Sequence, residues 1–274
     1  MKYLEYPLFA EGYVNRFLTA GVFTEVQQFD KVKLHGRVNE WLKKGFAIHE
    51  NPCRKEFVRK RQENMPDYLE LDGATDGKNV EVFGQTRPLI PYFPFGNTGV
   101  DGSGFYYCPT WLRMYSYVLL EAERDCDVEF ELETCGGVTI WVDGAFVTDF
   151  TPFTRNMVKK TTVVLPLKAG KNRLLVCLDD LAERDTDYYF RLKRLGDAAL
   201  TMLVPVRDEV EADVIGRLEN MLDQMYFDKE AYISETVKLN ILNPFSCPLP
   251  VAVAVAPGEF IEKMEGQESL VRTF

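Results

Sequence analysis

The sequence has only two histidines, His35 and His49, among 274 residues, and it lacks the motifs of several common catalytic sites. A Ser-His-Asp or Cys-His arrangement would need one of the two, yet neither lies in a G-x-S-x-G or H-E-x-x-H context. The glycine-rich stretches 96–99 and 101–104 do not end in Gly-Lys-Ser/Thr, so they predict turns rather than a phosphate-binding loop. We therefore assign no catalytic residue, no metal ligand and no cofactor, and leave a structural Ca²⁺ open.

Long apolar runs and a basic excess are also missing. No run approaches the ~18 apolar residues of a membrane span, and Glu5 and Glu11 interrupt what would be the apolar core of a secretory signal. The net charge is −10 and neither half of the chain is net positive, which disfavours nucleic acid as a partner. We expect a cytoplasmic protein with no membrane partner.

The six cysteines show no C-x-x-C spacing. A chain of this length does not need disulfides to fold, so we expect reduced and mostly buried thiols.

Alternation of apolar and polar residues predicts a mainly β protein. Val128, Phe130 and Leu132 alternate with glutamates, which is typical of a sheet with one face in water. Asp143-Gly144 separates two apolar runs and predicts a hairpin, because a type I′ turn needs positive φ at both central residues. Short strands at roughly ten-residue spacing between 112 and 193 favour an antiparallel sandwich or jelly roll.

A basic segment at 51–66 is expected to form a helix that Pro66 ends. Its cationic residues favour a solvated helix face over an anion-binding patch; they are Arg54, Lys55, Arg59, Lys60 and Arg61.

The domain boundaries follow from composition and spacing. Residues 1–206 are expected to form a jelly-roll sandwich with a long lead-in, and 207–231 an acidic linker helix in which Asp208 and Glu211 have capping-box spacing. Residues 232–274 contain fewer strands than an immunoglobulin-like sandwich needs. They are expected to be the start of a second, truncated sandwich.

Aromatic and polar side chains interleave between 92 and 113. Apolar faces of sugars stack on aromatic rings while polar neighbours bind hydroxyls, so this segment is the candidate carbohydrate site. The alternative, which we favour for these residue types, is that the aromatics fill the sandwich or an interface. The candidate residues are Tyr92, Phe95, Asn97, Asp101, Tyr106, Tyr107, Trp111 and Arg113.

Two turns carry a family resemblance. Residues 136–144 (GGVTIWVDG) and 165–176 (LPLKAGKNRLLV) are similar to the x-V-x-V-N-G-x-x-V and L-x-x-G-x-N-x-L-x-V turns of a known domain type. That type is the galactose-binding-like jelly roll at the N-terminus of multidomain glycoside hydrolases, including family 2 β-galactosidases and β-glucuronidases and the α-L-rhamnosidases. The resemblance covers about a third of the chain.

The resemblance implies a non-catalytic accessory region of a carbohydrate-active enzyme, with a downstream catalytic domain or another chain as partner. Two alternatives stay open: a stand-alone carbohydrate-binding module and a structural or assembly domain. Hydrolysis by this chain alone is the least favoured interpretation.

Overall fold

The computed structural model describes residues 2–27, 52–66, 68–71, 73–209, 211–227, 238–248, 252–255 and 270–273. The chain divides into two units, Met1–Val210 and Glu211–Phe274. Among the described residues, no helix has the length and apolar character to cross a bilayer.

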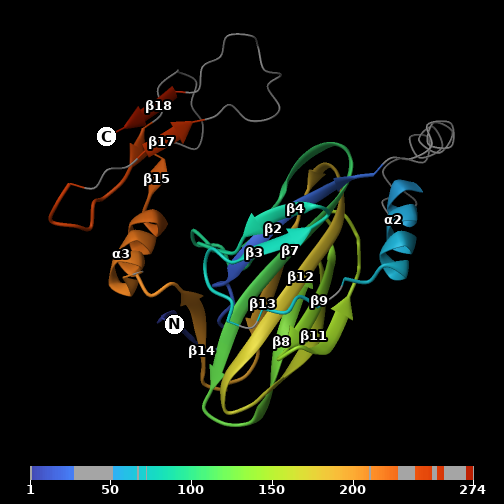
Figure 1. Ribbon diagram of the computed structural model, residues 1–274, viewed down its shortest axis with the longest axis horizontal. Coiled ribbons are helices and arrows are strands. Elements are labelled where there is room, and N and C mark those ends of the chain that lie inside the picture. Colours follow the sequence, from blue (N-terminus) through green and yellow to red (C-terminus); the bar gives the residue numbers. More distant parts are fainter. Residues whose placement is uncertain are drawn as a thin grey trace. The chain divides into compact units, whose positions relative to one another are not determined.

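The first unit is an antiparallel β-sandwich (Figure 1), which confirms the predicted fold class. Its larger sheet runs in the order β1 (Lys2–Leu8), β14 (Leu200–Val206), β7 (Gly104–Ala122), β12 (Gly170–Thr186), β9 (Gly137–Val142) and β10 (Ala145–Phe150). Joined to it are β2 (Leu18–Val26), which pairs with β7, and β5 (Ile90–Pro91), which pairs with β2.

The smaller sheet runs in the order β11 (Lys159–Leu167), β8 (Cys126–Thr134), β13 (Tyr189–Arg194) and β6 (Val100–Asp101). In β8, Phe130 and Leu132 are fully buried whereas Glu129 is exposed, as the alternation predicts. Glu133 departs from this pattern because it is buried. A separate hairpin joins β3 (Asn79–Val82) and β4 (Gln85–Pro88).

The two turns that carry the family resemblance have clear physical roles. Asp143 and Gly144 both adopt positive φ, +50° and +83°, in the two-residue connection between β9 and β10, which confirms the predicted hairpin. The buried side chain of Asn172 accepts from the Lys168 N–H at 2.7 Å and donates to the Leu120 carbonyl at 3.0 Å. It ties the turn before β12 to β7.

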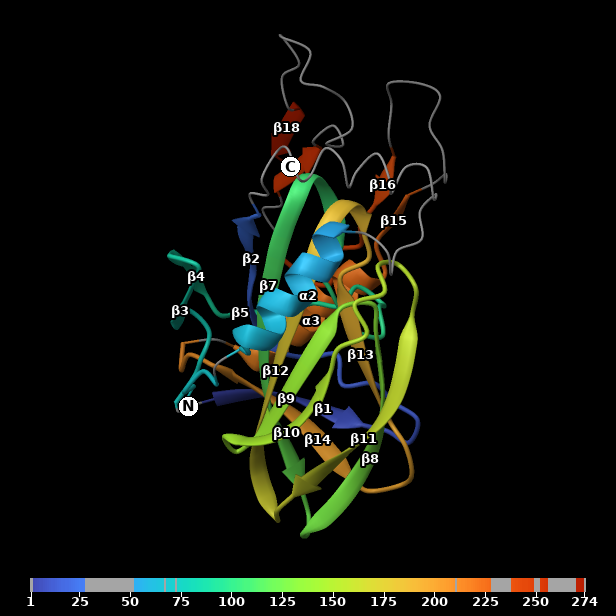
Figure 2. The same ribbon diagram turned by 90° about the vertical axis from the view of Figure 1, so that its right-hand side faces the viewer.

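Both faces of the larger sheet are covered, and the side chains of β12 are therefore buried along most of the strand. Leu174, Val176 and Leu178 occupy one face and are fully buried. Over the opposite face lies α2 (Pro52–Glu63), which crosses β7 and β12 (Figure 2). The predicted helix at 51–66 is therefore present, and it packs on the sheet.

The second unit holds α3 (Ala212–Asp223) and two short hairpins. These pair β15 (Tyr226–Phe227) with β16 (Leu239–Asn240) and β17 (Ala252–Val255) with β18 (Leu270–Thr273). The expected capping box at Asp208 is wrong: the N-cap is Glu211 itself, and no side chain bonds to the cap. Much of the predicted strand at 232–242 lies outside the described residues.

Candidate functional site

The structure separates the eight predicted site residues into a pair that α2 covers and a group that is exposed or partly buried. Trp111 and Arg113 lie on β7 beneath α2, and Trp111 is only 4% exposed. The others lie in the segment before β7, on β6 or at the start of β7; they are Tyr92, Phe95, Asn97, Asp101, Tyr106 and Tyr107. A sugar could reach only this second group.

Hydrogen bonds fix the segment that leads into β7. The Asp101 N–H donates to the Tyr92 hydroxyl at 3.0 Å, and the Asp101 carboxylate accepts from the Ser103 N–H at 2.8 Å. Partial burial raises the pKa of Tyr92, although the bond from Asp101 opposes this shift. The hydroxyl of Tyr92 therefore stays protonated at neutral pH, and Asp101 is held in place.

Two exposed aromatic rings belong to this part of the chain. Phe95 is 57% exposed at a left-handed backbone position with φ +47°. Tyr107 is 76% exposed, and its ring meets Phe105 edge-to-face with 4.9 Å between centroids. Tyr106 is partly buried and pairs across the strands with Arg184 of β12. The start of β7 therefore presents the Tyr107 ring to solvent.

Trp111 belongs to a buried cluster under α2. Its ring contacts Phe57 and Phe83, each with centroids 5.2 Å away, and its Nε1 donates to Asp179 Oδ1 at 3.2 Å. Arg113 stacks over the Phe83 and Trp111 rings. The alternative that aromatics of this segment fill the fold therefore describes Trp111, whose ring has no free face for a sugar.

Asp179 is the centre of a buried ionic network that was not predicted. Its fully buried carboxylate accepts from Arg113 Nε at 2.7 Å and from Arg61 Nε at 3.1 Å. Arg61 also donates to Thr139 Oγ1 at 3.0 Å and to Asp149 Oδ1 at 3.3 Å. Charges removed from water need such partners, so this network fixes α2 to the sheet.

Asp180, which follows Asp179 in the chain, is also buried and also pairs with an arginine of α2. Arg54 Nη1 donates to Asp180 Oδ1 at 2.8 Å, and Arg54 Nη2 donates to the Leu181 carbonyl at 2.8 Å. Burial raises the pKa of Asp180, although Arg54 opposes the shift. Burial alone would lower the pKa of Arg113, but Asp179, Cys177 and Tyr115 together outweigh burial and raise that pKa.

The interpretation of the α2 cations as a solvated face is therefore corrected for two of them. Arg54 and Arg61 are 3% and 1% exposed, whereas Arg59 points to solvent. A signal was present in the sequence: Arg54, Phe57 and Arg61 share one helical face, and Asp179-Asp180 interrupts an otherwise apolar strand.

The described residues contain no group of three or more His, Cys, Asp or Glu that could hold a metal ion. Five cysteines have described side chains, and all five are free thiols: Cys108, Cys126, Cys135, Cys177 and Cys247. Only Cys135 and Cys177 are buried, so the expectation of mostly buried thiols is wrong for this set.

No family model and no curated protein matches the sequence. Among solved structures, similarity is found to a family 35 carbohydrate-binding module from an environmental isolate, with 15% identity, a TM-score of 0.26, and coverage of 40% of this chain and 78% of the module. A GH31 α-xylosidase from Xanthomonas citri has 15% identity and a TM-score of 0.24 over 40% of this chain and 13% of the enzyme. A β-glucosidase from Kluyveromyces marxianus has 12% identity and a TM-score of 0.31 over 53% and 18% of the two chains.

Proposed function

We propose that the Met1–Val210 unit is a non-catalytic, carbohydrate-binding β-sandwich that serves as an accessory region of a carbohydrate-active enzyme. In this proposal the glycan contacts the exposed and partly buried members of the predicted site outside the α2 cover. We call them the β7-entry surface: Tyr92, Phe95, Asn97, Asp101, Tyr106 and Tyr107. The catalytic step would belong to another domain or another chain.

The observation that carries the proposal is the setting of Tyr107. Its ring is largely in water, yet the edge-to-face contact with Phe105 holds it in one orientation. A ring that is ordered before binding loses little conformational entropy when a pyranose stacks on it. The fixed carboxylate of Asp101 supplies a hydrogen-bond acceptor of the kind that sugar hydroxyls need. The resemblance of the two turns to galactose-binding-like domains supports the same conclusion.

The test compares two aromatic-to-alanine variants in a glycan array and in thermal unfolding. Tyr107→Ala should remove binding and leave the melting temperature nearly unchanged, because the ring is exposed. Trp111→Ala should instead destabilise the fold by about 3–5 kcal/mol, as expected when a large buried aromatic is truncated.

A third variant, Phe95→Ala, shows whether the glycan spans both exposed rings. The proposal fails if the wild-type protein retains no glycan on the array, or if Tyr107→Ala binds as the wild type does. A large loss of stability in Tyr107→Ala would assign this ring to the core instead.

A structural or assembly role is the second candidate, and the second unit favours it. Tyr226, Phe227 and Leu242 are exposed around the β15–β16 hairpin, and grouped apolar side chains in water often mark an interface between chains. Size-exclusion chromatography with light scattering tests this role: a concentration-dependent dimer that Phe227→Asp returns to a monomer supports it, and a monomer at all concentrations refutes self-assembly.

A further inference from the structure

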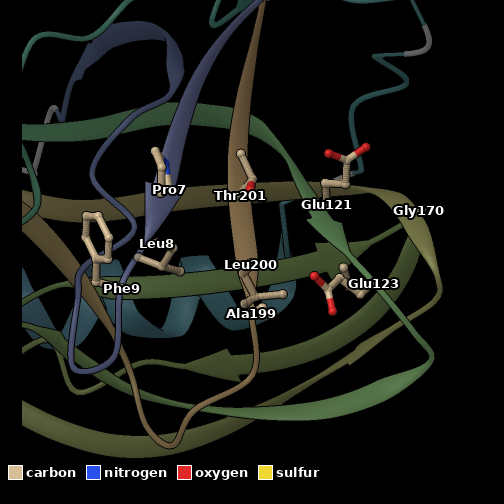
Figure 3. A pocket seen from close by; sticks show the side chains of 10 residues that line it. Pro7, Leu8, Phe9, Glu121, Glu123, Gly170, Ala199, Leu200 and Thr201 are labelled. Atoms are coloured by element: carbon tan, nitrogen blue, oxygen red, sulfur yellow. The ribbon is translucent and has the colours of Figure 1, made fainter.

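A pocket of about 580 Å³ lies where the ends of β1, β14, β7 and β12 meet (Figure 3). Leu8, Leu200 and Ala122 form a buried row across three of these strands. Glu121 pairs with Thr201, so both belong to the opposite face of the sheet. The lining is divided between the two faces and does not surround one ligand. The other end of β7 holds a more complete arrangement.

The exposure of the Tyr107 ring follows from a β-bulge. Between β7 and β12 the register passes from Thr110 opposite Ala182 to Tyr106 opposite Arg184, so β7 holds extra residues at this point. Tyr107 is one of them and has no β12 residue directly opposite it. Bulges are common beside binding sites because they change where a side chain points.

Asp185 of β12 lies on the same face of the sheet as the Tyr107 ring. It is directly opposite Phe105 in the antiparallel register, and directly opposite residues place their side chains on one face. Phe105 in turn contacts the Tyr107 ring, with 4.9 Å between the ring centroids. The three side chains therefore form an aromatic surface with a carboxylate beside it.

The carboxylate of Asp185 is available to a ligand. It is exposed, and it makes no hydrogen bond or ion pair within the part of the chain that the structure describes. The main chain around it is held by Asn156, whose Nδ2 donates to the Asp185 carbonyl at 3.1 Å and whose Oδ1 accepts from the Asp187 N–H at 2.8 Å. A fixed strand thus presents this carboxylate to water.

The nearby arginines are directed elsewhere. Arg184 is opposite Tyr106, and because side chains alternate along a strand, both lie on the other face. Arg155 is close enough for its charge to interact with Asp185, but its Nη2 donates to the Glu183 carbonyl, and among the described residues it forms no ion pair with Asp185. Asp185 therefore offers acceptors only, with a negative charge.

We propose that Asp185 selects the sugar that stacks on Tyr107, so that this site takes neutral glycans with two free adjacent hydroxyls and rejects anionic ones. The inference rests on the proposed function and names its substrate class. The two carboxylate oxygens accept one hydrogen bond from each of the adjacent hydroxyls while the sugar ring covers the tyrosine. A carboxylate or sulfate on the sugar would meet Asp185 as a like charge.

The experiment titrates the full chain with the methyl glycosides of glucose, galactose and mannose, each compared with its matched uronic acid. The backbone amides of Phe105, Tyr107 and Asp185 are followed by ¹H–¹⁵N NMR. At least one hexoside should shift these amides in a saturable way, and its uronic acid should bind roughly two- to five-fold more weakly, the value of one exposed charge pair. Added salt should reduce this difference, because exposed charges are screened.

Single deoxy derivatives of the hexoside that binds test the two hydroxyls. Removal of the hydroxyl at either of two neighbouring ring positions should weaken binding, because each leaves one carboxylate oxygen without its donor. Equal binding of every single deoxy derivative and the parent sugar would overturn the inference.

Substitutions then assign the selectivity. Asp185→Asn keeps the side-chain shape and removes the charge, so it should bind the hexoside more weakly and no longer distinguish it from the uronic acid. Asp127→Asn removes an exposed carboxylate of the smaller sheet and should keep the wild-type preference. If the preference persists in Asp185→Asn, or is absent in the wild type, while Tyr107→Ala still loses binding, this inference fails and the proposed function stands. No saturable shift with any of the hexosides would overturn both.

Discussion

Replacing Arg61 by methionine is the sharpest test of the charge network under α2. The substitution keeps most of the side-chain volume and a similar helix propensity, so its main effect is removal of the guanidinium. Asp179 then loses its bond from Arg61 Nε, and Asp149 loses its bond from Arg61 Nη2.

The expected loss of unfolding free energy in Arg61→Met depends on the partners that Asp179 keeps. Breaking a buried ion pair by removing one partner costs about 3–5 kcal/mol, because the other charge stays in a medium that solvates it poorly. Asp179 keeps Arg113 at 2.7 Å and the Trp111 N–H, so we expect the lower end of this range. The loss should change little with added salt, because the pair is screened from solvent.

The matched control is Arg59→Met, two residues earlier on the opposite face of the same helix. Arg59 pairs with Glu56 and Glu63 in water, and exposed pairs of this kind contribute little. Urea unfolding at pH 7, followed by tryptophan fluorescence and circular dichroism, gives both midpoints. Equal midpoints for the two variants would refute the assignment of Arg61 as a buried anchor.

Two further predictions concern the sheets. Lys160 and Arg191 hold the pKa of Glu133 below its usual range although burial opposes them, so its ion pairs stabilise the fold above about pH 4.5 and are lost as pH falls through the lowered pKa. The stability advantage of the wild type over Glu133→Gln should therefore be present at pH 7 and shrink on acidification in pH-dependent urea titrations; a constant difference would contradict this assignment. Gly136→Ala places a Cβ 2.5 Å from the Asp179 carbonyl oxygen and should cost about 1–3 kcal/mol by overpacking, measured as a lower melting temperature. Gly216→Ala, on α3 with open space around it, is the control that should not destabilise.

Local patterns predicted much of the fold. The Asp143-Gly144 turn, the alternation in β8 and the helix at 51–66 all follow from interactions between residues close in the sequence, and all are present. The helix start at Asp208 failed because capping depends on the backbone geometry just before the helix, which spacing alone does not fix.

The predicted site residues fall into a covered pair and an accessible group because burial depends on the whole fold. Tyr107 and Trp111 lie four residues apart on one strand, in a segment of similar composition. The Trp111 ring is covered by Phe57 of α2 and by Phe83, whereas Tyr107 lies beyond this cover. No local signal distinguishes the two rings.

The sequence by itself determined a mainly β chain, its hairpin turns and an acidic stretch over 207–235, because side-chain alternation and turn chemistry act between neighbours. Only the tertiary structure decided that Arg54 and Arg61 meet Asp180 and Asp179, and that four strand ends enclose a pocket beside Glu121 and Glu123. Arg54 and Asp180 are 126 residues apart in the chain, and Leu8 and Leu200 are 192 residues apart. Their contact depends on the packing of α2 and the register of the sheet.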